Sequence, residues 1–104
     1  MGKPEKEPRI SIQTLRVLEA FLAVPGGQLA GADVAGRGHL ASGTLYPILL
    51  RLESAGWLVS RWENIDPADA GRPRRRLYRM TPTGLRRASE VFATFNQVTS
   101  IQAT

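Results

Sequence analysis

The sequence predicts a mainly α-helical domain that carries a two-stranded β-wing and ends in one further helix. Apolar residues recur at steps of three and four along most of the chain, which is helical spacing. Between residues 57 and 81 the pattern changes to two short runs of strand formers, separated by a loop rich in proline, aspartate and glycine. A chain of 104 residues is long enough for one domain and too short for two.

Composition excludes several functional classes. With 42% hydrophobic and 22% charged residues and no long apolar run, the chain is predicted to be soluble and cytoplasmic, without a membrane span. It has no cysteine, and its single histidine, His39, leaves no cluster for a metal or a charge relay. We expect no metal, no cofactor and no enzymatic activity, because a nucleophile–base pair and a phosphate-binding glycine loop are also missing.

Charge is concentrated in one place. The formal net charge of +5 favours a polyanionic partner only weakly, because many unrelated small proteins are basic. Residues 72 to 79, "RPRRRLYR", hold five arginines and no acid. By contrast, residues 1 to 9, "MGKPEKEPR", mix both signs with proline, which predicts a disordered arm and no signal peptide.

Two helices are predicted in the first third of the chain. Residues 11 to 23 have a broad apolar face, and "VPGG" at 24 to 27 ends this helix. Residues 28 to 36 are predicted to form a short second helix, in which two glycines favour close packing or fraying. The positions expected to face inward in it are Leu29, Ala32, Val34 and Ala35.

The third helix follows the turn "RGHLA". Ser42 is the expected N-cap, with Thr44 as the competing candidate. Pro47 falls in or just beyond the first turn, where a missing N–H costs least, and Gly56 ends the helix. Its inward row is Leu45, Ile48, Leu49, Leu52 and Ala55.

The strand-forming runs "WLVSRWE" and "RRRLYRMT" predict a hairpin with a long loop. Thr81 then caps a fourth helix of about twenty residues, with Pro82 at its first position. The order helix, helix, turn, helix and hairpin is that of a winged helix-turn-helix domain. The predicted units are therefore an arm (1–9), this domain (10–80) and a C-terminal dimerisation helix (81–104).

In this layout the third helix lies in the DNA major groove, with its N-terminal residues nearest the bases. Ser42 and Thr44 supply small polar groups beside the positive end of the helix dipole. Tyr46 supplies a longer hydroxyl, and Arg51 a clamp for the DNA backbone. The alternative is that Ser42 and Thr44 only cap the helix and that Tyr46 is a packed aromatic residue.

The arginine run belongs to the predicted wing. Arg72, Arg74 and Arg75 stand at its tip and descending edge, where a wing can enter the minor groove or clamp phosphates. The alternative is a solvated loop. Arg76 is included in the predicted DNA-binding site, although it and Arg79 can also simply flank strand positions.

"SGTLYPILLRLESAGWLVSRWE" followed by "GRPRRRLYRMTPTG" resembles the PadR family of bacterial transcriptional regulators, over about residues 12 to 90. The resemblance implies a homodimeric repressor that binds a roughly palindromic operator in double-stranded DNA through a winged-helix domain. It places four residues at the head of the recognition helix and three in the wing. These are Ser42, Thr44, Tyr46 and Pro47, and Arg72, Arg74 and Arg75.

The chain departs from the family in three respects. In the shortened connection before the third helix, His39 occupies a turn position that glycine often fills in relatives, and a left-handed conformation is expected there. Ala32 stands where many relatives carry a tyrosine, and only one helix remains of a C-terminal domain that is often longer. That helix carries an apolar stripe expected to be exposed in a monomer and hence to form the dimer interface, with packing on the first helix as the alternative. The stripe consists of Val91, Phe92, Phe95 and Val98.

Two further functional questions stay open at this point. Some family members release DNA on binding a small molecule, and Trp57 and Trp62 are candidates to line such a pocket, with core packing as the alternative. The alternative function is a winged-helix protein–protein interaction module without specific DNA binding. In such a module, alanine at Arg72, Arg74 and Arg75 would leave function intact.

Overall fold

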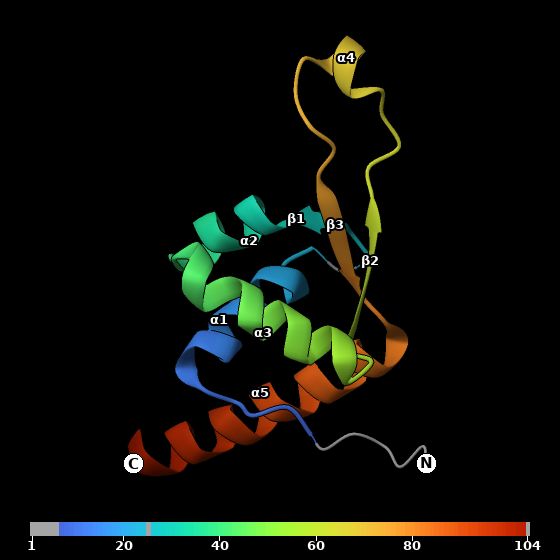
Figure 1. Cartoon of the computed structure of the whole chain (residues 1–104). Coiled ribbons are helices and arrows are strands. Elements are labelled where there is room, and N and C mark those ends of the chain that lie inside the picture. The colour runs from blue at the N-terminus through green and yellow to red at the C-terminus, as the bar shows by residue number, and fades with distance from the viewer. Residues whose placement is uncertain (1–6, 25, 104) are drawn as a thin grey trace.

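The computed structural model describes residues 7–24 and 26–103, with side chains through residue 96. Figure 1 shows the predicted mainly helical winged-helix fold, with three N-terminal helices, a projecting hairpin and a C-terminal helix. No helix within these described ranges is long and apolar enough to cross a membrane. The elements are α1 (Ile12–Leu22), β1 (Leu29–Ala30), α2 (Gly31–Gly38), α3 (Ser42–Ser54), β2 (Leu58–Trp62), α4 (Pro67–Ala70), β3 (Arg76–Met80) and α5 (Pro82–Ala103).

The core lies where α1, α2 and α3 meet the sheet. Burial of apolar side chains at this junction is the main source of stability for a domain of this size. Ser11 is the N-cap of α1, and its hydroxyl oxygen accepts from the Thr14 N–H at 3.1 Å. Ile12 is 58% exposed and so lies outside the core. The largest fully buried apolar residues are Phe21, Leu18, Leu45, Leu49, Leu52, Leu58, Val17 and Val34.

The prediction of a helix over residues 28–36 is wrong at its start. Leu29 and Ala30 form β1, which pairs antiparallel with β3 and makes the sheet three-stranded in the order β1-β3-β2. The helix α2 begins only at Gly31 and continues to Gly38. Ala32, expected to face inward, is exposed, whereas Val34 is buried. Pairing with a distant strand overrode the local helical pattern.

The prediction that Ser42 or Thr44 caps α3 is also wrong. The N-cap is Ala41, which has no side-chain cap, and its carbonyl accepts from the Thr44 N–H at 3.0 Å. Two other predictions about this helix are confirmed. His39 adopts the left-handed conformation, with φ 54° and ψ 50°, and Gly56 ends α3 with φ +82°. The Trp57 N–H then donates to the Leu52 carbonyl at 2.9 Å, as in a Schellman motif.

The predicted hairpin is confirmed as β2 and β3, which pair antiparallel from Leu58–Met80 to Trp62–Arg76. The connecting loop contains a short helix, α4, that was not expected. Figure 1 shows α4 at the far end of the wing, away from the helical body. The side chain of Asp66 caps it by accepting from the Ala68 N–H at 3.0 Å.

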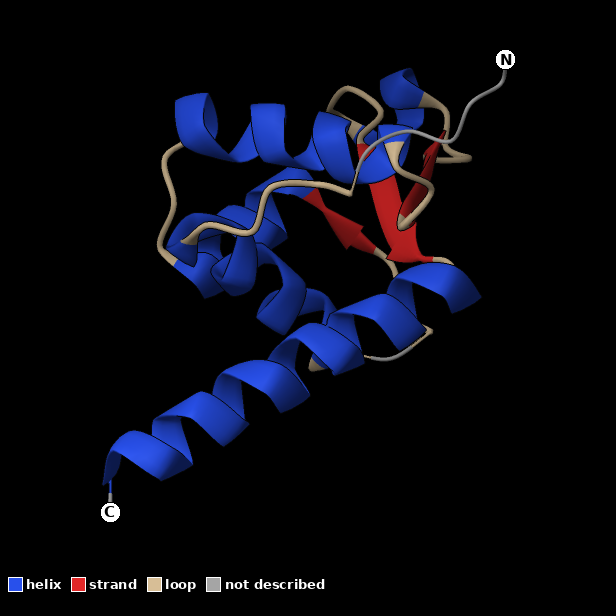
Figure 2. Ribbon diagram, turned by 90° about the horizontal axis from the view of Figure 1, so that it is seen from below, coloured by secondary structure: helices blue, strands red, loops and turns tan. Residues whose placement is uncertain are grey.

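α5 begins as predicted at Thr81 and Pro82. The hydroxyl oxygen of Thr81 accepts from the Gly84 N–H at 2.9 Å and donates to the Gly56 carbonyl at 2.7 Å. A Cβ at Gly84 would overlap the carbonyl oxygen of Trp57, so the first turn of α5 lies directly on the chain that follows α3. Figure 2 shows α5 crossing the base of the domain and extending beyond it.

Part of the predicted arm and of the predicted interface lies outside the described residues. Residues 1–6 of the arm and the side chain of Val98 are among them. Glu7, at the first described position, forms an ion pair with Arg87 of α5.

Candidate nucleic-acid interface

The head of α3 presents the small polar residues that the sequence indicates. Ser42, Thr44 and Pro47 are exposed. Because Ala41 is the N-cap, the hydroxyls of Ser42 and Thr44 are not used for capping and bond no residue that the structure describes. They stand at the N-terminal end of α3, where the helix dipole favours an anion such as a phosphate.

Tyr46 combines the two interpretations that the sequence left open. Its side chain is 48% exposed, yet it packs on Gly31 at the start of α2. A Cβ at Gly31 would overlap the Tyr46 hydroxyl oxygen and lie 2.8 and 2.9 Å from two ring carbons. Packing on α2 therefore fixes the ring while part of it stays accessible.

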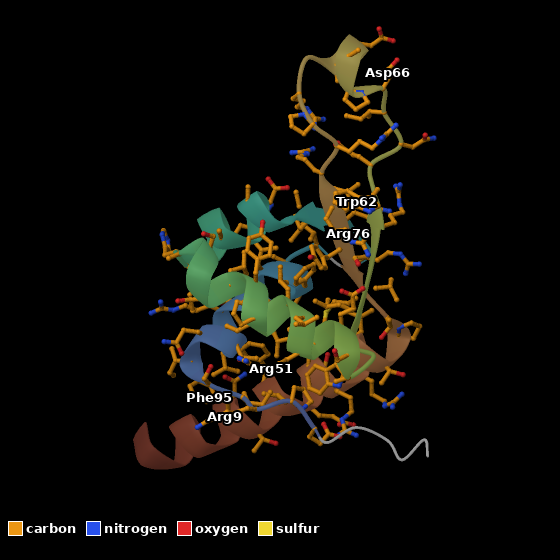
Figure 3. All side chains as sticks on the ribbon, viewed as in Figure 1. Arg9, Arg51, Trp62, Asp66, Arg76 and Phe95 are labelled. Atoms are coloured by element: carbon orange, nitrogen blue, oxygen red, sulfur yellow. The ribbon has the colours of Figure 1, made fainter. Side chains whose placement is uncertain are left out.

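Arg51 is separated from the wing. It is exposed near the end of α3, and Figure 3 shows it below that helix, whereas Trp62 and Arg76 lie at the base of the wing. Of the predicted DNA-binding residues, Arg51 is thus on a different flank of α3 from the arginine-rich segment.

The wing arginines are organised by Glu63, the first residue after β2. Its carboxylate accepts from Arg72 Nη1 and Nη2 at 2.7 and 2.9 Å. It also accepts from the Arg75 backbone N–H and from Arg75 Nη2, each at 3.1 Å. The Glu63 backbone N–H donates to the Arg75 carbonyl at 2.8 Å, which continues the strand pairing beyond Trp62–Arg76. One residue therefore bridges the two limbs of the wing.

The electrostatics of Glu63 follow from these contacts. Hydrogen bonds from Arg72 and then Arg75 stabilise the carboxylate and lower the pKa of Glu63 to about 2. In return, Glu63 raises the pKa of Arg72. At neutral pH Glu63 is a charged bridge. The arginines of the wing outnumber this one carboxylate, so the segment keeps a net positive charge.

The remaining wing arginines have different contacts. Arg74 Nε donates to the Ile65 carbonyl at 2.9 Å. The Arg76 guanidinium lies 5.0 Å from the centre of the Trp62 ring, which is within cation–π range. These contacts hold the stems of both side chains against the wing.

A chain of hydrogen bonds links the wing to α3. Arg76 Nε donates to Ser60 Oγ at 3.0 Å, and Ser60 Oγ donates to Glu53 Oε2 at 2.6 Å. Glu53 is in the last turn of α3. The wing base and α3 are thereby positioned relative to each other by side chains as well as by the sheet.

The head of α3, the start of α2 and the wing meet in a cleft of about 370 Å³. It brings Tyr46 together with Arg74, Arg75 and Arg76, but it does not include Ser42, Thr44, Arg51 or Arg72. Its lining residues are Ala30, Gly31, Ala32, Tyr46, Trp62, Arg74, Arg75 and Arg76. The surface combines concave shape with positive charge, which suits the backbone of a nucleic acid.

Several residues of this region were not singled out from the sequence. Glu63 looked like one of several scattered acids, although its position between a strand and an arginine run is a usable signal for a bridging role. Ser60 and Glu53 are seven residues apart, and only the turn after α3 brings them together. The two tryptophans differ: Trp57 is buried in the core, as the alternative held, and Trp62 is 58% exposed on the wing.

The predicted dimer stripe is only partly exposed. Val91 and Phe92 are half-buried against the core of the same chain, which agrees with the alternative of packing within the chain. Phe95 is 47% exposed. Phe95 and Val91 line a groove of about 550 Å³ with residues 10–12, Leu15 and Thr94, so α1 and α5 share one apolar surface.

Comparison with known proteins gives the family. Residues 32–90 match the sequence model of the transcriptional regulator PadR-like family, which is more than half of the chain. Among curated proteins, no sequence matches.

Solved structures with the same fold include three regulators. A PadR family transcriptional regulator from Eggerthella lenta is 26% identical, with a TM-score of 0.70 over 88% of this chain and 81% of that one. One from Clostridium difficile is 17% identical, with a TM-score of 0.74 over 89% and 96% of the two chains. Bordetella bronchiseptica BpsR, whose DNA binding is regulated by 6-hydroxynicotinic acid, is 18% identical, with a TM-score of 0.71 over 95% and 69%.

Proposed function

Because the chain belongs to the PadR-like family of transcriptional regulators, we propose that it is a cytoplasmic, sequence-specific DNA-binding repressor that binds an inverted-repeat operator as a homodimer. In this proposal α3 enters the major groove and the wing contacts the phosphates or the minor groove. Family membership supports the class of function, and the geometry of the positive cleft supports the proposed mode of binding.

The observation that carries the proposal is the cleft between α3 and the wing. Tyr46 lines this cleft from the head of α3 together with Arg74, Arg75 and Arg76, and the helix begins with the backbone N–H groups of Ser42 and Gly43, for which the described residues provide no acceptor. A duplex placed against this surface meets base-reading groups and phosphate-binding groups at once. The Glu63 bridge orders the wing before binding, which reduces the conformational entropy lost in the complex.

Dimerisation is supported by the apolar groove between α1 and α5. Ile12 and Phe95 are 58% and 47% exposed in a single chain, and apolar surface of this kind is typical of an interface. A two-fold axis at this groove would present two copies of α3 to two half-sites, and this gives the expected inverted repeat.

A small-molecule effector stays a prediction. BpsR is regulated in its DNA binding by 6-hydroxynicotinic acid, so the shared fold is compatible with such control. In this chain Trp57 is in the core and does not line an accessible pocket. Between the subunits of the proposed dimer, the groove beside Phe95 is the apolar space in which an effector would be sought.

The test is a selection from random duplex DNA with the purified full-length protein. We expect enrichment of an inverted repeat whose half-sites are about one helical turn apart, roughly 34 to 36 Å. A repressor additionally lowers transcription from a reporter promoter that contains this repeat. If no sequence is enriched and all duplexes bind equally weakly, the proposal is wrong, and a winged-helix module that binds another protein becomes the better explanation.

A further inference from the structure

The exposed side of α3 contains a leucine that has no role in the site described above. Leu50 is 65% exposed, more than any other large hydrophobic side chain in the described part of the chain. A single exposed leucine is ordinary on a protein surface. Its position on the recognition helix is what gives it significance.

Leu50 lies in the middle of the face that α3 turns away from the core. The buried row of this helix is Leu45, Ile48, Leu49 and Leu52. With 3.6 residues per turn, the opposite row runs through Gly43, Pro47, Leu50 and Ser54, and all four are exposed. Tyr46 and Arg51 flank this row on either side.

The chemistry of this row is unusual for a surface that reads bases. Gly43, Pro47 and Leu50 offer no side-chain hydrogen-bond donor or acceptor, and no member of the row is charged. In the major groove the apolar group available to such a surface is the C5-methyl of thymine, because the other base edges present hydrogen-bonding atoms. Duplex DNA is the occupant that the surrounding charge favours, since the chain carries a net charge of +5 and Arg74–Arg76 lie on the neighbouring wing.

We propose that Leu50 packs on a thymine C5-methyl group in each half-site and thereby selects a T·A pair at that position. This inference rests on the proposed function and adds the base that one named residue reads. Uracil is the matched probe, because it keeps the base pairing and the O4 acceptor of thymine and lacks only the methyl group. Loss of one buried methyl contact corresponds to roughly a fourfold loss of affinity, and loss in both half-sites to roughly fifteenfold.

The experiment uses the duplex obtained from the selection. Each thymine is replaced by uracil in both half-sites, one symmetric pair at a time, and binding is measured by fluorescence anisotropy. The proteins are wild type, Leu50→Ala, Leu50→Met and the control Val59→Ala. Val59 is also an exposed apolar residue, but it lies on β2 and does not line the cleft beside Tyr46.

We expect one thymine position at which uracil weakens wild type and Val59→Ala by about fifteenfold. At that position Leu50→Ala should lose less than about twofold, and Leu50→Met, which keeps an apolar side chain, should remain sensitive. Because Leu50 is exposed, the melting temperature of each variant should stay close to that of wild type, which separates recognition from folding.

Two results would overturn the assignment while leaving the proposed function standing. If every uracil substitution affects Leu50→Ala and wild type alike, another group reads the methyl. If no uracil substitution weakens wild type, no thymine methyl is contacted. If the selection yields no preferred duplex, the proposed function fails first, and the assignment of Leu50 fails with it.

Discussion

The guanidinium group of Arg72 donates two hydrogen bonds to the carboxylate of Glu63, at 2.7 and 2.9 Å. This paired geometry is stronger and more directional than a single charge contact. The same carboxylate receives Arg75 from the facing limb of the wing. The Glu63 bridge therefore connects the two limbs of the wing beyond the last strand pair, so the shape of the wing does not depend on the three-stranded sheet alone.

Protonation of Glu63 at low pH should break the Glu63 bridge. The pKa of Glu63 is lowered to about 2 from an ordinary value of 4.5, so its stabilising contribution is complete above about pH 4.5 and is lost as the pH falls toward 2. Carbon-13 NMR of the Glu63 carboxyl should give a midpoint near 2 in wild type. In Arg72→Ala/Arg75→Ala the midpoint should rise toward 4.5. A wild-type midpoint already near 4.5 would show that the bridge does not form.

A side chain at Gly31 should destabilise the fold as long as Tyr46 is present. Gly31→Ala places a Cβ on the Tyr46 ring and should lower the free energy of unfolding by about 1 to 3 kcal/mol. Gly36→Ala is the matched control in the same helix, because a Cβ there meets no atom within 4 Å. It should be stabilising by about 0.4 to 1 kcal/mol.

Urea denaturation measures both changes. The cost of Gly31→Ala should also shrink in a Tyr46→Ala background, because the overlapping ring is then gone. Equal effects at Gly31 and Gly36 would contradict the packing of Tyr46 on α2.

Gly84 should be more sensitive still, because its neighbour is backbone. A Cβ at this position would overlap the Trp57 carbonyl oxygen, which is held by the Thr81 N–H at 3.0 Å. Gly84→Ala should therefore lower the free energy of unfolding by at least about 2 kcal/mol in urea titrations. Ser89→Ala, at an exposed position of the same helix, should change it by less than about 0.5 kcal/mol. Comparable losses in the two variants would argue against close packing of α5 on Trp57.

The proposed dimer should dissociate when charge is placed in the groove between α1 and α5. Phe95→Glu and Ile12→Glu each put a carboxylate into a surface that both subunits would bury in a two-fold symmetric interface. Sedimentation velocity should show a dimer for wild type and at least tenfold weaker association for both variants. Val59→Glu, at an exposed position on β2, should remain dimeric. Monomeric wild type at micromolar concentration would count against this interface.

The sequence was sufficient for the parts of the fold that depend on local patterns. Helical periodicity predicted α1, α3 and α5, and the cap at Thr81 and the stop at Gly56 were confirmed because each acts within a few residues of chain. The hairpin was recognisable from its strand formers and its loop. The left-handed conformation of His39 was expected from the family resemblance, because glycine often fills this turn position in relatives, and it is confirmed.

The errors come from interactions between distant residues. β1 has only two residues, and it is a strand because Leu29 and Ala30 pair with Tyr78 and Leu77. Predicting the Glu63 bridge would have required knowing that residue 63 faces residues 72 and 75 across the wing. The prediction of the α3 cap failed for a different reason. Ala41 is the N-cap and has no side-chain cap, so the hydroxyls of Ser42 and Thr44 are not used for capping.

The salt dependence of binding to the selected duplex tests the DNA-binding mechanism most directly. The proteins are wild type, Arg74→Ala/Arg75→Ala and Arg16→Ala/Arg86→Ala. Arg74→Ala/Arg75→Ala keeps Arg72 on Glu63. Arg16→Ala/Arg86→Ala is the control, which removes two exposed arginines outside the wing and its cleft. Each phosphate contact contributes about −0.9 to the slope of log K against log salt concentration. A dimer that loses two contacts per subunit should therefore bind more weakly, with a slope shallower by about 3 to 4, while the control keeps the wild-type slope. Identical slopes and affinities for wild type and the wing variant would contradict a wing that clamps DNA.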